Sequence, residues 1–106
     1  MAHRTLIVAR LDPAIAGAVA QAFAESDATD LPHRIGVTRR TLLRFHGLYL
    51  HLIESDDPIG PRLGEHRDHP LFRQVDTALA EYVKPYDPNW RQPSDAMATP
   101  FYTWSA

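Results

Sequence analysis

The stretch from Arg34 to Glu54 constrains the fold more than any other part of the sequence. Two runs rich in strand-forming residues, IGVTRRTLLRF and LYLHLIE, flank the dipeptide His46-Gly47. A two-residue turn at this dipeptide pairs residues whose numbers add to 93, so the register follows from the turn. We therefore expect an antiparallel hairpin in which the partner of every side chain is defined.

This register sorts the side chains of the hairpin onto two different faces. One face is an apolar band that ends in a charge pair, and it consists of Phe45/Leu48, Leu43/Leu50, Thr41/Leu52 and Arg39/Glu54. The other face mixes apolar and polar groups, and it consists of Arg44/Tyr49, Leu42/His51 and Arg40/Ile53. Both faces need cover, because a soluble monomer rarely exposes a contiguous apolar patch of this size.

The chain before the hairpin contains one strand and one helix. Residues 4–11 form a short apolar run that is typical of a central strand buried on both faces. Asp12 and Pro13 form a helix start, since an Asp side chain accepts free backbone N–H bonds and proline fits the first helical position. The helix is expected to run to about Glu25, with an apolar stripe at Ile15, Val19, Ala22 and Phe23. Residues 26–32 break this pattern.

The chain after the hairpin is predicted to contain a loop, a helix and a last strand. Prolines and glycines punctuate residues 55–69, which we interpret as a loop. Pro70 opens a second helix that ends at Pro85, and its apolar residues are Leu71, Phe72, Val75, Leu79, Tyr82 and Val83. The aromatic run PFYTW at residues 100–104 suits the last strand.

The order strand, helix, strand, strand, helix, strand is the split βαβ or ferredoxin-like arrangement of the α+β class. We expect one domain over residues 1–106, with a four-stranded antiparallel sheet and two helices on one face. The apolar band then lies on the uncovered face, where a second copy would cover it. This predicts a homodimer, and the mixed face encloses a pocket with its own helices.

Charge and cysteine content narrow the classes of function. The 11 Lys and Arg against 13 Asp and Glu leave no basic stripe for nucleic acid or an anionic membrane. The absence of cysteine excludes a disulfide scaffold and a thiolate zinc site. Neither a membrane span nor a signal peptide is predicted, so we expect a cytoplasmic protein. No phosphate loop, dinucleotide fingerprint or GxSxG motif occurs, and no cofactor is expected.

The six histidines do not show the spacing of a metal site. Surface or capping roles suit four of them, namely His3, His33, His46 and His66. His69 is expected to cap the second helix or to cover the mouth of the pocket. His51 differs because the register places it mid-strand on the mixed face, where an ordinary pKa near neutrality suits acid or base catalysis. A core histidine bonded to a neighbour is an equally good interpretation.

Arg40 is the second candidate, because a buried guanidinium needs an anion or another acceptor. It either pairs with an acidic side chain or meets a ligand oxygen. Asp27, at the end of the first helix, is the expected protein partner, and a purely structural ion pair is the alternative. Several aromatic residues could line a flat apolar cavity, although their spacing is also that of core residues: Phe23, Tyr49, Phe72, Tyr82, Tyr86 and Trp90.

Sequence stretches along nearly the whole chain resemble a known family. They are RTLIV and LDP, FAESDATDLP, IGVTRRTLLRFHGLYLHLIE, HPLF and FYTW, of which residues 39–54 are the most specific. The chain resembles the small aromatic polyketide cyclases of bacterial type II pathways, the family typified by the tetracenomycin cyclase. The resemblance implies a ferredoxin-like dimeric α/β barrel with a cavity between sheet and helices, and transient contact with polyketide synthase components.

The resemblance also implies a reaction, which is late ring closure of a partly cyclised poly-β-ketone. The closure is an intramolecular aldol condensation with loss of water, and it needs no cofactor. Arg40, His51 and Asp27 match polar cavity positions, with Arg40 as charge stabiliser, His51 as acid or base, and Asp27 as its helper or as the partner of Arg40. The expected substrate-binding residues are Leu42, Tyr49, Phe23, Ile53, Phe72, His69 and Trp90.

One departure from the family and two alternative functions remain open. The family can place a histidine directly before the aspartate that ends the first helix, whereas this chain has Ser26. His51 and Asp27 are therefore the more important candidates for acid or base catalysis. The alternative is that the cavity only holds the polyketide in the shape that closes the ring. The enzyme alternative is a cofactor-independent monooxygenase of anthrone-type polyketides. The other alternative is a non-catalytic module that binds a polyketide or acts as its chaperone.

Overall fold

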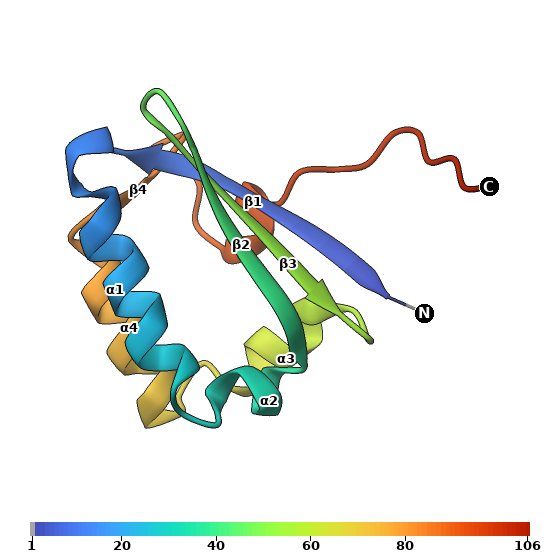
Figure 1. Cartoon of the computed structure of the whole chain (residues 1–106), viewed down its shortest axis with the longest axis horizontal. Coiled ribbons are helices and arrows are strands. Elements are labelled where there is room, and N and C mark those ends of the chain that lie inside the picture. The colour runs from blue at the N-terminus through green and yellow to red at the C-terminus, as the bar shows by residue number, and fades with distance from the viewer. Residues whose placement is uncertain (1) are drawn as a thin grey trace.

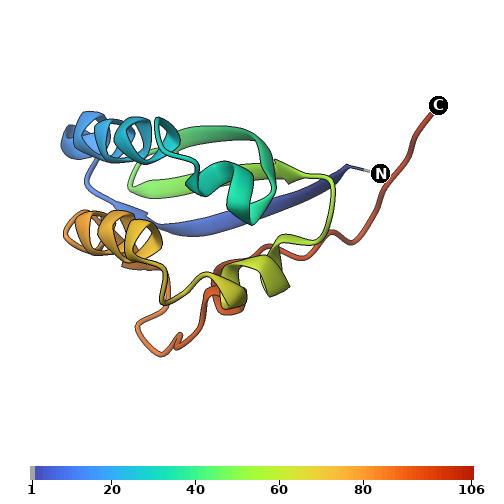
Figure 2. The ribbon, with the colours of Figure 1, turned by 90° about the horizontal axis from the view of Figure 1, so that it is seen from below.

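A four-stranded antiparallel sheet forms one layer of the structure, a computed structural model that describes residues 2–106 (Figure 1). Its strands are β1 (His3–Leu11), β2 (Val37–Phe45), β3 (Leu48–Ser55) and β4 (Val83–Pro85), in the spatial order β2-β3-β1-β4. The second layer contains the helices α1 (Ala16–Asp27) and α4 (Pro70–Ala80), with the shorter α2 (Leu31–Ile35) and α3 (Ile59–Glu65). All four helices lie on the same side of the sheet (Figures 1 and 2). The predicted ferredoxin-like fold is confirmed.

The first strand and helix form largely as predicted. β1 lies between β3 and β4 and is therefore central, although its residues 5–8 are only half-buried in the single chain. The Asp12 side chain accepts a hydrogen bond from the backbone N–H of Ala14 at 3.0 Å. A 3₁₀ turn over Pro13–Ile15 follows, and α1 then continues to Asp27, two residues beyond the expected end. Val19 and Phe23 are the buried residues of the apolar stripe of α1.

The hairpin has the predicted register. β2 pairs with β3 from Arg39↔Glu54 to Phe45↔Leu48, so the two-residue turn at residues 46–47 is confirmed. His46 is the left-handed residue of this turn, with φ of 52°. β3 alternates without exception between half-buried and buried residues, the buried ones being Tyr49, His51, Ile53 and Ser55. The mixed face therefore looks toward the helices; we call it the inner face of the sheet, and the opposite one the outer face.

The segment before β2 differs from the prediction. The pattern predicts an irregular stretch over residues 26–32 and a strand that begins near Arg34, but residues 31–35 form α2 and β2 begins at Val37. Pro32 lies in the first turn of α2, and Gly36 ends it with φ of 93°, a left-handed conformation that favours glycine. This prediction was wrong because the alternation of Ile35 and Val37 resembles a strand, whereas proline and glycine at the two ends are the signature of a helix.

The connection after β3 and the end of the second helix also differ. Residues 59–65 form α3 within the predicted loop, and Ile59 is buried. α4 ends at Ala80 rather than at Pro85, since residues 83–85 form β4 along Ala9–Leu11 of β1. The apolar positions of helix and strand continue one another without a break in spacing, so hydrophobic periodicity alone does not reveal this boundary.

The predicted last strand at residues 100–104 is wrong. No strand forms there, and Phe101, Tyr102 and Trp104 are 99%, 79% and 73% exposed. The free edge of β1 is already taken by β4 and by a bridge between Ile7 and Met97. The tail leaves the sheet after this bridge and extends away from the body of the molecule (Figure 1).

Two buried clusters join the sheet to the helices. The first lies beneath α1 and α4 and contains Ala9, Leu11, Val19, Phe23 and Tyr49. The second lies beneath α2 and α3 and contains Leu31, Ile35, Ile53 and Ile59. Ile7 and Val75 pack against both clusters. Within residues 2–106, no helix combines the length and the apolar character that a membrane crossing requires.

Candidate active site

A cavity of about 370 Å³ lies where the two clusters meet, between the inner face of the sheet and the helices. Its apolar wall includes Ile7, Phe23, Leu31, Ile35, Ile53, Ile59 and Phe72. Its polar groups are fewer and come from three elements: Ser26 of α1, Arg40, Tyr49 and His51 of the hairpin, and Asp76 of α4. An apolar cavity with a few convergent polar groups is the usual form of a small-molecule site.

Arg40 is held in this cavity by an ion pair with Asp27 at the end of α1. Its Nη2 donates to Oδ1 of Asp27 at 2.8 Å, and its Nε lies 3.1 Å from Oδ2. The two side chains are 15% and 39% exposed, so the pair is partly shielded from water. The guanidinium also lies over the Phe23 ring, 4.7 Å from its centroid. This cation–π contact and the two-point ion pair fix the plane of the guanidinium.

Arg40 also contacts His51, and His51 contacts Tyr49. Nη1 of Arg40 lies 3.0 Å from Nε2 of His51, and Nδ1 of His51 lies 3.0 Å from the Tyr49 hydroxyl. Burial, and to a smaller extent the adjacent Arg40 charge, together lower the pKa of His51 to about 3. Burial raises the pKa of Tyr49 well above its ordinary value, and the Arg40 charge opposes this only in part. At neutral pH the histidine is uncharged and the tyrosine is protonated.

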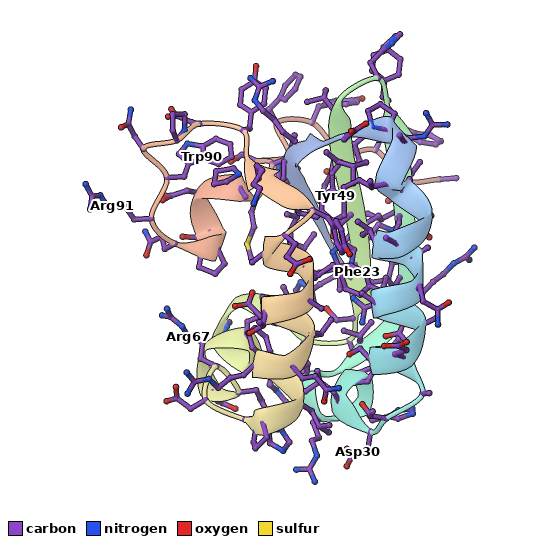
Figure 3. The ribbon with its side chains drawn as sticks, turned by 90° about the vertical axis from the view of Figure 1, so that its left-hand side faces the viewer. Phe23, Asp30, Tyr49, Arg67, Trp90 and Arg91 are labelled. Carbon is purple, nitrogen blue, oxygen red and sulfur yellow. The ribbon has the colours of Figure 1, made fainter. Side chains whose placement is uncertain are left out.

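The structure brings together most of the residues predicted from the sequence. Arg40, Tyr49, His51, Ile53, Phe23 and Phe72 all line the cavity, and Asp27 reaches it through Arg40. Figure 3 shows Phe23 and Tyr49 in the space between α1, α4 and the sheet. The ring of Phe23 stands edge-on to that of His51, with 5.0 Å between the centroids.

Three predicted substrate-binding residues lie elsewhere. Leu42 is on the inner face but lines a smaller hollow of about 170 Å³ beneath the start of α1. His69 caps α4, since its Nδ1 accepts from the backbone N–H of Leu71 at 3.1 Å. Trp90 lies in the loop after β4, where its ring is tilted against that of Tyr86 with 5.9 Å between the centroids, away from the cavity (Figure 3). None of the three is among the residues that line the larger cavity.

Two polar residues of the cavity were not predicted as site residues. Ser26 lies one residue before Asp27, and it faces the cavity from the last turn of α1. Asp76 is exposed and faces the cavity from α4. Its signal in the sequence is the spacing of four residues from Phe72, which places both on one side of the helix. Within residues 2–106, no group of three or more His, Asp or Glu side chains could hold a metal ion.

The structure therefore combines a ferredoxin-like fold with a largely apolar cavity of the size that small organic molecules occupy. Comparison with known proteins then identifies the family. The model of the polyketide synthesis cyclase family matches residues 3–105, and the chain belongs to this family of enzymes.

Two relatives and one solved structure support this assignment, and a second solved structure shares the fold. The chain is 53% identical over 106 residues to tetracenomycin F2 cyclase of Streptomyces glaucescens, which covers 100% of this chain and 97% of that protein. It is 45% identical over 103 residues to polyketide synthase CurG of Streptomyces cyaneus, with 96% of each covered. The solved structure of tetracenomycin F2 cyclase superimposes with a TM-score of 0.93 at 52% identity, over 98% of both chains. A Caulobacter crescentus protein assigned to the antibiotic biosynthesis monooxygenases shares the fold alone. It is 18% identical, with a TM-score of 0.57 over 77% of this chain and 78% of that one.

Proposed function

We propose that this cyclase closes a ring of a partly cyclised aromatic polyketide by an intramolecular aldol condensation followed by loss of water. The observation that carries the proposal is the guanidinium of Arg40, which is 15% exposed, fixed by Asp27, and directed at an apolar cavity of about 370 Å³. Membership of the cyclase family supplies the class of substrate. The apolar wall suits the planar rings already formed, and the polar groups suit the remaining carbonyl oxygens.

The reaction needs little from the enzyme beyond position and charge stabilisation. A carbon between two carbonyl groups loses its proton readily, and its enol attacks a carbonyl carbon of the same chain. A carbon–carbon bond forms, and the carbonyl electron pair moves onto oxygen, which takes up a proton. The new hydroxyl then leaves with a neighbouring hydrogen as water, and the ring becomes aromatic. Holding a flexible chain so that one pair of carbons meets contributes up to about 7–11 kcal/mol in favourable cases.

Arg40 stabilises the oxygen on which negative charge develops. Its guanidinium is already oriented by Asp27 and Phe23, so little reorganisation is needed during the reaction. Asp27 acts as the partner that fixes Arg40. His51 lies between Arg40 and Tyr49, so its place in the site is supported by two short contacts.

The outer face of the sheet supports the proposal of a homodimer. Leu43 and Phe45 are 46% and 61% exposed there, and Leu50 and Leu52 beside them are half-buried. A second copy would cover this face and bring two sheets together as a dimeric α/β barrel. We further propose a cytoplasmic enzyme that contacts polyketide synthase components only transiently.

The test is a cyclisation assay with purified protein and a partly cyclised aromatic polyketide, with oxygen excluded. The proposal predicts ring closure that is faster and more uniform than in buffer, with a product lighter by one water. Products that gain oxygen only after air is admitted would instead identify a monooxygenase. Tight binding of the polyketide without turnover would identify a binding or chaperone module.

A further inference from the structure

The contact between Arg40 and His51 fixes where the proton of the histidine lies. A guanidinium has only N–H donors and no acceptor, so Nη1 of Arg40 donates to Nε2 of His51 across the 3.0 Å contact. Nε2 therefore carries no proton. The neutral imidazole must then carry its single proton on Nδ1, because one of the two ring nitrogens is always protonated in this form.

This tautomer determines the direction of the next hydrogen bond. Nδ1–H of His51 donates to the Tyr49 hydroxyl oxygen, which lies 3.0 Å away and acts as the acceptor. The proton of the Tyr49 hydroxyl is then free to point elsewhere. Within residues 2–106, His51 is the one hydrogen-bond partner of this hydroxyl, and both residues line the larger cavity. No acceptor among the described residues is left for the hydroxyl proton, so this proton is available to an oxygen of a molecule bound in the cavity.

We propose that Tyr49 is a further catalytic residue, whose hydroxyl donates a hydrogen bond to the substrate carbonyl oxygen that becomes an oxyanion during ring closure. His51 is the positioning residue that turns the hydroxyl proton toward the cavity. This inference rests on the proposed function. It differs from the expectation that His51 itself exchanges protons with substrate, because both ring nitrogens of His51 are occupied by protein groups.

The three side chains form one directed series of donors that starts at a cation. Arg40 donates to His51, His51 donates to Tyr49, and Tyr49 donates to the substrate oxygen. Each hydrogen bond in such a series polarises the next, so the charge of Arg40 makes the distant phenol a stronger donor. The buried ring of Phe23 packs edge-on against His51, the middle member of the series, and covers one side of it.

The electron and proton balance of this step is simple. The carbon–carbon bond forms from the enol carbon, and the carbonyl electron pair moves to the oxygen that Tyr49 faces. Tyr49 keeps its proton and stabilises the new charge through a hydrogen bond. The high pKa of the buried phenol agrees with a donor that is not itself ionised. The enol hydroxyl gives its proton to water as its own carbonyl re-forms, and the oxyanion takes a proton from water, so no proton is gained or lost overall.

The first test is Tyr49→Phe in the anaerobic cyclisation assay, because this change removes one oxygen and keeps the ring. We expect kcat to fall roughly a hundredfold with KM nearly unchanged, which is the size typical of one lost oxyanion donor. Tyr82→Phe is the matched control, since Tyr82 packs against the first cluster and does not line the cavity. It should keep full activity.

A second variant separates positioning from a structural role. His51→Asn should lower kcat without raising KM, and the double variant with Tyr49→Phe should lose no more activity than Tyr49→Phe alone, because the two groups act in one series. Independent losses that multiply would overturn the series. If the wild-type protein closes no ring, the proposed function fails. If wild type is active and Tyr49→Phe is equally active, the role of Tyr49 alone fails.

An NMR measurement on the wild-type protein needs no substrate and remains decisive even if Tyr49→Phe folds poorly. The ¹⁵N shifts of the His51 ring should show a neutral imidazole with its proton on Nδ1 from pH 8 to pH 5. A proton on Nε2, or an imidazolium in this range, would contradict the proposed direction of the hydrogen bonds.

Discussion

The two faces of the β2–β3 hairpin contrast sharply, although they are made by the same two strands. On the inner face Tyr49, His51 and Ile53 are no more than 5% exposed, and the polar groups are bonded to one another. On the outer face Leu43 and Phe45 stay largely exposed. The register joins Leu6 and Val8 of β1 to this outer patch, opposite Leu52 and Leu50.

Successive residues of a strand point to opposite faces of the sheet. The residues proposed for catalysis and those proposed for the dimer interface therefore alternate along the same two strands. The inner face is completed by its own helices, so its polar groups can be oriented within one chain. The outer face is apolar and has no cover from its own helices, which lie on the other side (Figure 2). The adjacent residues Arg39 and Arg40 show the contrast most directly, with side chains that are 75% and 15% exposed.

A charge in the outer patch gives the largest expected effect. Leu43→Lys or Leu50→Lys places two lysines, one from each copy, in the proposed interface. Because burial of an unpaired charge costs several kcal/mol, the dimer dissociation constant should rise by about a thousandfold or more. Sedimentation or light scattering over a concentration series measures this directly.

The control adds the same charge outside the patch. Thr38→Lys lies at the exposed start of β2 and should leave the dimer intact. A Leu43→Lys protein that remains as dimeric as wild type would show that the outer face is not the interface. The monomeric variant should still fold, because Leu43 is 46% exposed in the single chain.

Protonation of His51 gives the next effect, on the inner face. Its folded pKa of about 3 lies below the ordinary value of 6.5, so below pH 6.5 the unfolded chain binds a proton that the folded chain excludes. Stability is therefore complete above pH 6.5 and falls as the pH falls toward 3. Between pH 7.5 and pH 5 the free energy of unfolding should drop by about 2 kcal/mol.

Urea unfolding of wild type and His51→Asn at several pH values isolates this effect. The two proteins differ only at residue 51, so the difference between the two curves belongs to His51. Wild type should lose its advantage over the variant as the pH falls. Parallel curves would mean that His51 is not shielded as the structure describes.

The ion pairs of the two faces give the smallest expected effects. Asp27→Asn weakens the inner pair, whose closest contact is 2.8 Å, and should cost about 1 kcal/mol of stability. Glu54→Gln weakens the outer contacts with Arg4 and Arg39, at 3.5 Å and 3.7 Å, and should cost less than about 0.5 kcal/mol. Equal urea midpoints for the two variants would show that the inner ion pair contributes no more to stability than the outer contacts.

The sequence predicts the hairpin and much of the inner face because these depend on local rules. Turn length fixes the register, and alternation then places Arg40, His51 and Tyr49 on one face. Short elements were harder to predict. α2 and α3 span five and seven residues, too few for a clear helical period, and β4 follows α4 without a change in apolar spacing. Only tertiary pairing with β1 reveals β4.

The candidate site likewise has features that the sequence predicts and features that only the structure shows. The Arg40–Asp27 pair could be expected from the charge of a buried arginine and the place where α1 ends. The direction of the His51 hydrogen bonds could not, because it depends on distances of 3.0 Å between atoms of different residues. Trp90 was expected at the substrate, but it lies in the loop after β4, near Tyr86. His69 was expected to cap the second helix or to cover the mouth of the pocket, and the first alternative is confirmed. Their roles toward a substrate remain predictions without support from the geometry.

The most direct test of the account compares Arg40→Gln with Arg39→Gln in the anaerobic cyclisation assay. The two substitutions are chemically identical and lie one residue apart on opposite faces. Arg40→Gln should lower kcat/KM by a hundredfold or more, as expected for loss of the charge that stabilises the oxyanion and orients the Tyr49 donor through His51, while Arg39→Gln stays close to wild type. Equal activity of the two variants would contradict the claim that the inner face of the hairpin carries the chemistry.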